Sequence, residues 1–217
     1  MQFLIAQSTY DEIQVGLFSD SQQLDQQTVS KFDACKQLIS TIQALLNRNN
    51  TDIAHLSFIG INLGPAPFNS LRILISTING IAFAAHVPLA GVDGLKALYA
   101  SSRAPQTVVL LNAFNQEVYY AYKKQADLAL GVAHIDEIIP ALMLYLPHGS
   151  ITCLGNGAVM FKKQIFAAFG QRAFIPEPTN TLLLATLAQI CSNKFNQNEQ
   201  IQYATPLYLK RAVQKII

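Results

Sequence analysis

Residues 55–85 read HLSFIGINLGPAPFNSLRILISTINGIAFAA, and this stretch decides the fold class. The apolar run at 55–61 is typical of a buried strand. The sequence Gly64-Pro65-Ala66-Pro67 then predicts a rigid turn. Residues 70–85 are apolar on nearly all sides of a helix, as in a helix that a core or a partner covers. A buried strand, a turn and a buried helix in this order predict an α/β domain.

Strands and helices are predicted on both sides of this stretch. Upstream, we expect strands at 3–6, 13–18 and 22–29 and a helix at 33–47. Downstream, we expect a strand at 87–90, a helix at 93–100, strands at 107–111, 117–122, 128–132 and 150–154, and helices at 136–145, 157–169 and 179–192. The spacing of apolar residues carries these predictions. Each half begins with strands and continues with alternating helices and strands, which predicts two related α/β lobes.

The predicted boundary between the lobes lies at the small and polar residues 101–105 (SSRAP), which look like a linker. A chain of 217 residues is long enough for one large domain or two small lobes. We therefore expect an N-terminal lobe at 1–103 and a C-terminal lobe at 104–202. The segment 203–217 is a candidate to return to the first lobe.

Composition excludes several classes of protein. Apolar residues make up 51% of the chain and charged residues 13%, which is opposite to the composition of disordered proteins. The net charge of +2 is too small to indicate a partner. The residues from Lys194 onward sum to +3, since Lys194, Lys210, Arg211 and Lys215 face Glu199 alone. This C-terminal charge is either a solvated surface or a weak contact with RNA or an acidic partner.

The cysteines and the uncharged run at 73–92 bear on localisation. Three scattered thiols, Cys35, Cys153 and Cys191, form neither a disulfide framework nor a spaced zinc set, so we expect reduced cysteines in a cytoplasmic protein. The run at 73–92 is long enough to span a bilayer. It contains several polar residues and ends near Pro88, so a buried helix is the better interpretation and no membrane contact is expected.

Few residues suggest catalysis. The four histidines are isolated, and the sequence contains no Walker A loop, no G-x-G-x-x-G and no G-x-S-x-G. A two-lobed protein that hydrolyses ATP needs carboxylates near its first strand and turn to hold Mg²⁺. That segment here reads Leu4-Ile5-Ala6-Gln7-Ser8-Thr9, with Asp11 as its first acidic residue. We therefore expect no catalytic residue, no metal and no cofactor.

Several segments in order resemble the TsaB (YeaZ) family. Residues 5–9 occupy the place of its I-D-T-S-T, 64–74 that of GPGSFTGLRIG, 88–98 that of P-[LIV]-x-G-V-[DS]-x-L-x-A-L, 112–119 that of D-A-R-x-x-E-V-Y and 206–210 that of P-x-Y-L-R. Gly64, Pro65, Phe68, Leu71, Arg72 and Ile73 match the second motif in register. The resemblance extends over nearly the whole chain.

The resemblance implies a two-lobed actin-like ATPase fold, of the ribonuclease H-like class, and a non-catalytic role. Proteins of this family bind and activate a TsaD-type transferase, which makes N6-threonylcarbamoyladenosine (t6A) next to the tRNA anticodon. The implied partners are the TsaD-type paralogue, a TsaE-type ATPase and a second copy of the chain, with tRNA contacted only indirectly or weakly. The predicted interface comprises Leu38, Ile42, Leu45, Leu71, Arg72, Ile75 and Ile78 on the helices at 33–47 and 70–85, and the family-motif turn comprises Gly64, Pro65 and Phe68.

Departures from the family pattern bear on nucleotide binding. Ala6 replaces the family's aspartate in the first motif, and Asn112 and Phe114 replace the aspartate and arginine of D-A-R. Loss of these groups weakens the case that the chain itself binds a nucleotide or Mg²⁺. The alternative is an active nucleotide-binding phosphotransferase or ATPase of the same fold.

Overall fold

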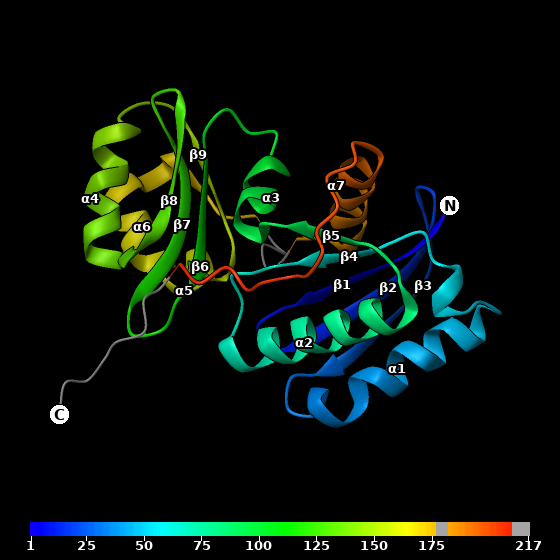
Figure 1. The fold of residues 1–217 in the computed structure, drawn as a ribbon. Coiled ribbons are helices and arrows are strands. Elements are labelled where there is room, and N and C mark those ends of the chain that lie inside the picture. The colour runs from blue at the N-terminus through cyan, green and yellow to red at the C-terminus, as the bar shows by residue number, and fades with distance from the viewer. Residues whose placement is uncertain (177–181, 210–217) are drawn as a thin grey trace. The chain divides into compact units, whose positions relative to one another are not determined.

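The structure, a computed structural model, describes residues 1–176 and 182–209 in two compact units (Figure 1). Unit 1 contains Met1–Gly94 and Leu182–Leu207, and unit 2 contains residues 95–176 and 208–209 of the described chain. The elements of unit 1 are β1 (Gln2–Ser8), β2 (Glu12–Ser19), β3 (Gln22–Ser30), α1 (Ala34–Arg48), η1 (Ile53–His55), β4 (Ile59–Asn62), α2 (Phe68–Ala85), β5 (Leu89–Val92) and α7 (Leu184–Asn196).

The sheet of unit 1 has the order β3-β2-β1-β4-β5. Strands β1, β2 and β3 pair antiparallel, whereas β4 pairs parallel with β1 and with β5. Helices α1 and α2 lie side by side and run in the same direction along one face of this sheet (Figure 1). Helix α7 packs against β1, β4 and β5, so both faces of the sheet are covered.

Alternate residues of β1 face the two layers. Leu4 and Ala6 belong to the apolar cluster that α1 and α2 complete, whereas Ile5 lies toward α7. Gly60 of β4 lets α7 approach closely, because a Cβ atom at this position would lie 2.6 Å from the sulfur of Cys191. Burial of both faces explains why β1 reads as a continuous apolar run rather than as an alternating pattern.

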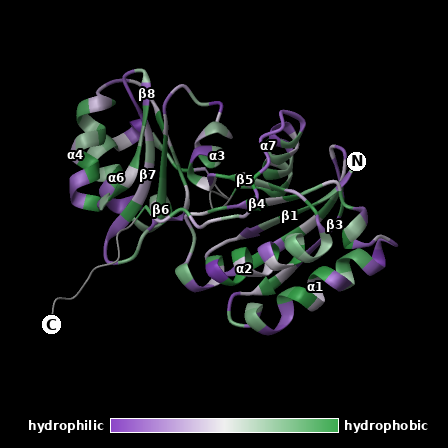
Figure 2. Ribbon diagram, viewed as in Figure 1, coloured by the Kyte–Doolittle hydropathy of each residue, from purple (hydrophilic) through white to green (hydrophobic). Residues whose placement is uncertain are grey.

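Unit 2 repeats this arrangement with a second sheet, in the order β10-β9-β6-β7-β8. Its elements are α3 (Gly94–Ala100), β6 (Thr107–Asn112), β7 (Glu117–Lys124), β8 (Asp127–His134), α4 (Ile135–Tyr145), β9 (Ile151–Leu154), α5 (Asn156–Met160), α6 (Lys162–Phe169), η2 (Gly170–Arg172) and β10 (Ala173–Phe174). Strands β6, β7 and β8 pair antiparallel, and β9 pairs parallel with β6 and with β10. In Figure 2, α4 carries hydrophobic residues along much of its length, and part of this surface joins the core of the unit.

The structure divides the chain differently from the expected 1–103 and 104–202. The two units separate between Gly94 and Leu95, not at the predicted linker. Helix α7 lies in unit 1, although the sequence reading assigned it to the C-terminal lobe. The reason is that its apolar residues Leu187 and Cys191 cover the second face of the first sheet, and periodicity does not say which sheet a helix covers.

Two further predictions concern segment ends. The helix expected at 157–169 is two helices, α5 and α6, which meet at Phe161. The helix expected at 179–192 begins at Leu184, while residues 177–181 lie outside the described chain. Of the segment 203–217, residues 203–207 lie in unit 1, where the Leu207 N–H donates to the Leu63 carbonyl, and residues 210–217 lie outside the described chain.

Helix α2 is the element that the uncharged run at 73–92 predicted. Among the described residues it is the one helix long and apolar enough to cross a membrane by length and composition. Its residues Leu71, Leu74 and Ile78 are buried in the cluster that β1 and β4 share. Packing within the chain therefore explains why α2 is apolar on the side that faces the sheet.

Candidate partner-binding face and the closed strand turns

The end of β1, where a nucleotide-hydrolysing protein of this kind needs a carboxylate, carries a buried amide. Gln7 is 1% exposed. Its Nε2 donates to Oε1 of Gln14 and to the carbonyl of Leu182, both at 2.7 Å. Its Oε1 accepts from Nδ2 of Asn62 at 3.4 Å. The Gln7 amide therefore stabilises the fold of unit 1 through these hydrogen bonds. The preceding residue, Ala6, is fully buried.

The hydroxyl groups next to Gln7 also bind within the chain. Ser8 Oγ donates to Ser70 Oγ at 2.9 Å, and Ser70 Oγ donates to the carbonyl of Pro67 at 3.1 Å. Thr9 Oγ1 donates to the Glu12 carbonyl at 3.0 Å. These bonds tie the β1–β2 turn to the first turn of α2. The turn is thus closed by hydrogen bonds within unit 1.

The equivalent turn of unit 2, between β6 and β7, is closed in a different way. The Phe114 N–H donates to Oδ1 of Asn112 at 2.8 Å, and the Asn112 N–H donates to Oδ1 of Asn156 at 3.0 Å. Phe114, Asn115 and Gln116 all have left-handed backbone, with φ of 62°, 52° and 61°. Asn112 therefore shapes a tight turn. No group of three or more metal-ligating side chains occurs in the described parts of the chain.

The six apolar residues predicted as interface anchors lie in the core of unit 1. Each exposes 4% or less of its surface: Leu38, Ile42, Leu45, Leu71, Ile75 and Ile78. These side chains pack mainly against the core of unit 1, and Ile42 also lines the groove between the two helices. The most regular apolar stripe of each helix faces the chain's own sheet, and a role of these six residues in an interface stays a prediction.

The other predicted residues lie where α2 begins. Arg72 is exposed, and its guanidinium lies 5.1 Å from the ring centre of Phe68, which is 55% exposed. Gly64 has φ of 106°, and its N–H donates to Oδ1 of Asn62 at 2.9 Å. A Cβ atom on Gly64 would lie 2.9 Å from Leu71, so glycine fits the turn both by conformation and by space. Pro65 is buried beside it.

Different residues of α1 and α2 remain accessible, and sequence reasoning missed them. Ile39 on α1 is 65% exposed, and Phe83 near the end of α2 is 84% exposed. Gly80 lies three residues before Phe83 on α2, and a Cβ atom at this position would have no atom within 4 Å. On a helical wheel Phe83 lies well outside the stripe of buried residues of α2, and this offset was a signal that could have identified it, whereas Ile39 lies next to the buried Leu46 and carried no such signal.

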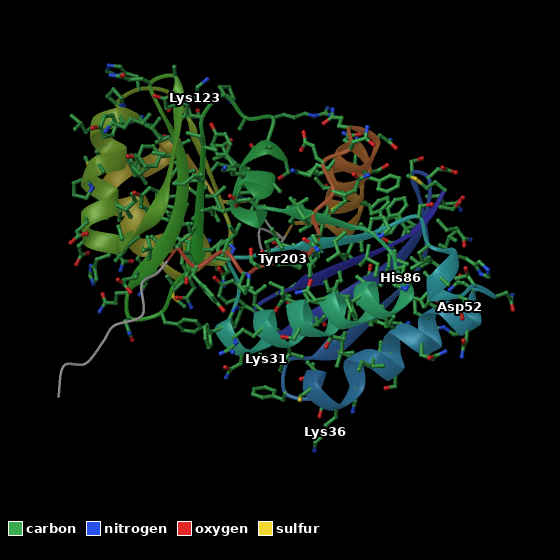
Figure 3. All side chains as sticks on the ribbon, viewed as in Figure 1. Lys31, Lys36, Asp52, His86, Lys123 and Tyr203 are labelled. Atoms are coloured by element: carbon green, nitrogen blue, oxygen red, sulfur yellow. The ribbon has the colours of Figure 1, made fainter. Side chains whose placement is uncertain are left out.

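A groove separates the two helices at their C-terminal halves. It has a volume of about 130 Å³ and is lined by Ile39, Ile42, Gln43, Leu46, Thr51, Asp52, Ile53 and Ile81. Oδ1 of Asp52 accepts from the Ala54 N–H at 3.0 Å and so caps η1 at the end of the groove. In Figure 3, Asp52 and His86 lie at one end of the helix pair and Lys31 and Lys36 at the other. Helices α1 and α2 themselves contain no Asp or Glu.

Comparison with known proteins agrees with the resemblance over the whole chain. A family model described as TsaD, tRNA N6-adenosine threonylcarbamoyltransferase, matches residues 33–192. The tRNA threonylcarbamoyladenosine biosynthesis protein TsaB of Escherichia coli (strain K12) is 22% identical over 231 residues, which cover 98% of this chain and 96% of that protein.

Solved structures show the fold. YeaZ from Pseudomonas aeruginosa matches with a TM-score of 0.72 and 20% identity, over 96% of this chain and 99% of that chain. An uncharacterized protein with similarity to peptidase YEAZ, also from Pseudomonas aeruginosa, matches with a TM-score of 0.74 and 19% identity over the same shares. A putative N-acetylmannosamine kinase from Listeria monocytogenes matches with a TM-score of 0.51 and 11% identity, over 92% of this chain and 100% of that chain.

The predicted two-lobed actin-like ATPase fold is confirmed by these neighbours and by the two repeated sheets. The family model covers most of the chain, and the relatives named TsaB and YeaZ match along nearly their whole length. This chain therefore belongs to the TsaB/YeaZ family, within the group described by the tRNA N6-adenosine threonylcarbamoyltransferase model.

Proposed function

We propose that this chain is a non-catalytic subunit that binds and activates a TsaD-type transferase in t6A modification of tRNA in the cytoplasm. Family membership supports a role in this modification. The observation that carries the proposal is the accessible side of α1 and α2, with Ile39, Phe83 and the groove between the helices. We call this surface the helix face.

The helix face has the properties of a docking site. Exposed apolar side chains that gather beside a groove mark an interaction site, whereas single ones are common on the surface of monomers. The small residue Gly80 lets a partner helix approach closely, and Ile39 borders a groove that one partner side chain can fill. Because neither helix carries an acidic residue, Asp52 at the end of the groove is the one carboxylate among the groove-lining residues, and its Oδ1 already accepts from the Ala54 N–H.

The non-catalytic part of the proposal is supported by the closed turns. Gln7 and Asn112 stand near the positions where an ATP-hydrolysing member needs carboxylates, and both bind groups of their own unit. An amide carries no charge to hold Mg²⁺. The alternative is a phosphotransferase or ATPase, and it predicts measurable binding of Mg-ATP to the chain. Calorimetry that detects such binding would favour the alternative.

The same face can serve other members of the assembly. In isolation, we expect two copies to pair through it and so form a homodimer. When the TsaD-type paralogue is present, we expect the heterodimer to replace this homodimer, because both use α1 and α2. A TsaE-type ATPase then joins the heterodimer through other surfaces.

Co-purification with the TsaD-type paralogue of the same organism tests the proposal. Size-exclusion chromatography with light scattering gives the mass of the complex. We expect a heterodimer with the native chain and none with Ile39→Asp or Phe83→Asp. Leu144→Asp is the matched control, because Leu144 is an aliphatic residue on helix α4 of unit 2 and is 70% exposed, close to the 65% of Ile39.

The co-purification has one outcome that contradicts the choice of surface and another that contradicts the scaffold role. Truncating a central interface side chain commonly costs about 2 kcal/mol or more, which weakens binding roughly thirtyfold, and a buried charge costs more. If Leu144→Asp disrupts the complex and Ile39→Asp does not, the helix face is the wrong surface. If the native chain forms no complex with a folded paralogue, the scaffold role itself fails.

A further inference from the structure

Four basic residues described in unit 2 lie at one end of its sheet, apart from Lys96 on α3 and from Lys162 and Lys163 at the start of α6. Lys123 and Lys124 end β7, Arg103 lies just before β6, and Arg172 lies just before β10. We call these four residues the basic end. Figure 3 shows Lys123 at the tip of the sheet. The accompanying acidic residue is Asp127, which pairs in register with Lys124.

Contacts within unit 2 hold these residues together. Thr107 Oγ1 donates to Ser102 Oγ at 2.7 Å, which keeps the neighbouring Arg103 beside the first residue of β6. β6 lies next to β7, since Val108 pairs with Tyr122, the residue before Lys123. The nitrogen of Lys124 lies 4.5 Å from the ring centre of Tyr145, at the end of α4.

Arg172 closes the other side of the basic end. Its Nη2 donates to the Leu146 carbonyl at 2.7 Å and its Nε to the Gly149 carbonyl at 2.8 Å. The guanidinium thereby fixes the exposed loop at 147–150, and Gln106 Nε2 donates to the His148 carbonyl from the β6 side at 2.7 Å. Arg172 contributes charge and holds the loop, whereas Arg103, Lys123 and Lys124 are exposed, Lys124 with its ammonium against Tyr145.

The remaining acidic residues described in unit 2 lie at the opposite end. Glu117 begins β7, seven residues before Lys124, which is roughly 23 Å along a strand. Asp136 and Glu137 occupy the first turn of α4, whose last residue is Tyr145. Charges separated by more than about 8 Å are largely screened at physiological salt. The acidic residues therefore do not cancel the field of the basic end.

We propose that the basic end of unit 2 binds the phosphate backbone of an RNA. Exposed lysine and arginine side chains bind phosphates and release counterions, which is the main source of sequence-independent affinity for nucleic acid. The loop at 147–150 adds an exposed imidazole and hydroxyl beside these cations. The choice of RNA over an acidic protein or a lipid surface rests on the proposed role in tRNA modification.

Binding of a fluorescein-labelled, unmodified tRNA transcript to the full chain tests the proposal. Fluorescence anisotropy at 50, 100 and 200 mM salt gives both the affinity and its salt dependence. The test variant is Lys123→Glu with Lys124→Glu. The matched control is Lys162→Glu with Lys163→Glu, because these two exposed consecutive lysines lie in the same unit at the start of α6 and the change in net charge is identical.

We expect the test variant to bind the tRNA about tenfold more weakly than the native chain at 50 mM salt, and the control variant to bind within about twofold of it. Losing two phosphate contacts lowers the slope of log affinity against log salt by about 1.5. Equal weakening by both variants would overturn the proposal, because net charge alone would explain it. No binding by the native chain at 10 μM protein and 50 mM salt would also overturn it.

Two further measurements keep this result separate from the proposed function. Vesicles of phosphatidylserine should not compete with the tRNA, and tighter binding to vesicles than to tRNA would overturn the RNA assignment. The test variant should still form the heterodimer with the TsaD-type paralogue, since the basic end shares no residue with the helix face. Loss of tRNA binding with an intact heterodimer supports the inference; intact tRNA binding without a heterodimer contradicts only the scaffold role.

Discussion

The amide nitrogen of Gln7, at the end of β1, lies 2.7 Å from the carbonyl oxygen of Leu182, the first described residue of the segment that rejoins unit 1. A buried side chain next to Ala6, where the resemblance would place an aspartate, thus fixes the start of the segment that leads into α7. The bond is buried, so its loss leaves polar groups without partners.

Gln7→Leu should lower the free energy of unfolding by about 1–3 kcal/mol, because it strands the Leu182 carbonyl and the side chains of Gln14 and Asn62. Urea denaturation followed by circular dichroism measures this loss. The control is Gln23→Leu on β3, where the exposed amide bonds only to Gln26, and a change within about 0.5 kcal/mol is expected. Equal effects of the two changes would show that the Gln7 network contributes nothing to stability.

Gly60→Ala and Gly80→Ala should change stability in opposite directions. A Cβ on Gly60 would lie 2.5 Å from Ile5 and 2.6 Å from Cys191, so crowding should cost about 1–3 kcal/mol. A Cβ on Gly80 meets nothing within 4 Å, and alanine favours the helix by up to about 1 kcal/mol. Thermal denaturation measures both, at a chain concentration at which light scattering gives the mass of a monomer. A stabilised Gly60→Ala would contradict the close packing of α7 on β4.

Gln116→Gly should stabilise the chain by up to about 1 kcal/mol, since residue 116 has φ of 61° and glycine adopts this conformation without steric cost. Gln22→Gly is the matched control, because Gln22 is exposed in the extended strand β3, and this change should cost about 0.5–1 kcal/mol. Denaturant midpoints of the two variants provide the comparison. A loss of stability at both positions would argue against the left-handed turn.

The three thiols should differ sharply in reactivity. Burial raises the pKa of Cys153 and of Cys191 to about 12, whereas Cys35 is exposed at the start of α1. Only the thiolate reacts, so at pH 8 the two buried residues are protonated as well as inaccessible. Titration with a disulfide reagent should give one fast thiol in the native chain and three in guanidinium chloride. Two or three fast thiols under native conditions would contradict the placement of these cysteines.

The sequence predicted the elements better than their assembly. The run at 3–6 and the helix at 33–47 are present because local spacing determines them. Helix α7 was assigned to the wrong lobe, since its contacts with β4 and β5 join residues about 100–130 positions apart along the chain, and periodicity holds no information on such contacts. The matched family motif did locate the turn at Gly64, where backbone geometry and space both call for glycine.

The interface prediction shows a second limit. Apolar spacing identified Leu38 and Ile75 because regular spacing marks a buried stripe, and a stripe that faces the chain's own sheet gives the same signal as one that faces a partner. Ile39 shares the three- and four-residue spacing of the buried residues, and Phe83 belongs to a helix that is apolar on nearly all sides, so periodicity does not separate these two residues from the core. Exposure could be assigned to these residues only once the sheet under α1 and α2 was known.

The most direct test of the central claim is the rate of t6A formation by the TsaD-type paralogue on unmodified tRNA, supplied with the adenylate donor, in the presence of this chain. We predict that the native chain and Leu144→Asp raise this rate by the same factor, and that Ile39→Asp and Phe83→Asp, folded by circular dichroism, do not raise it. Full activation by Ile39→Asp and Phe83→Asp would contradict the claim that the helix face binds and activates the transferase.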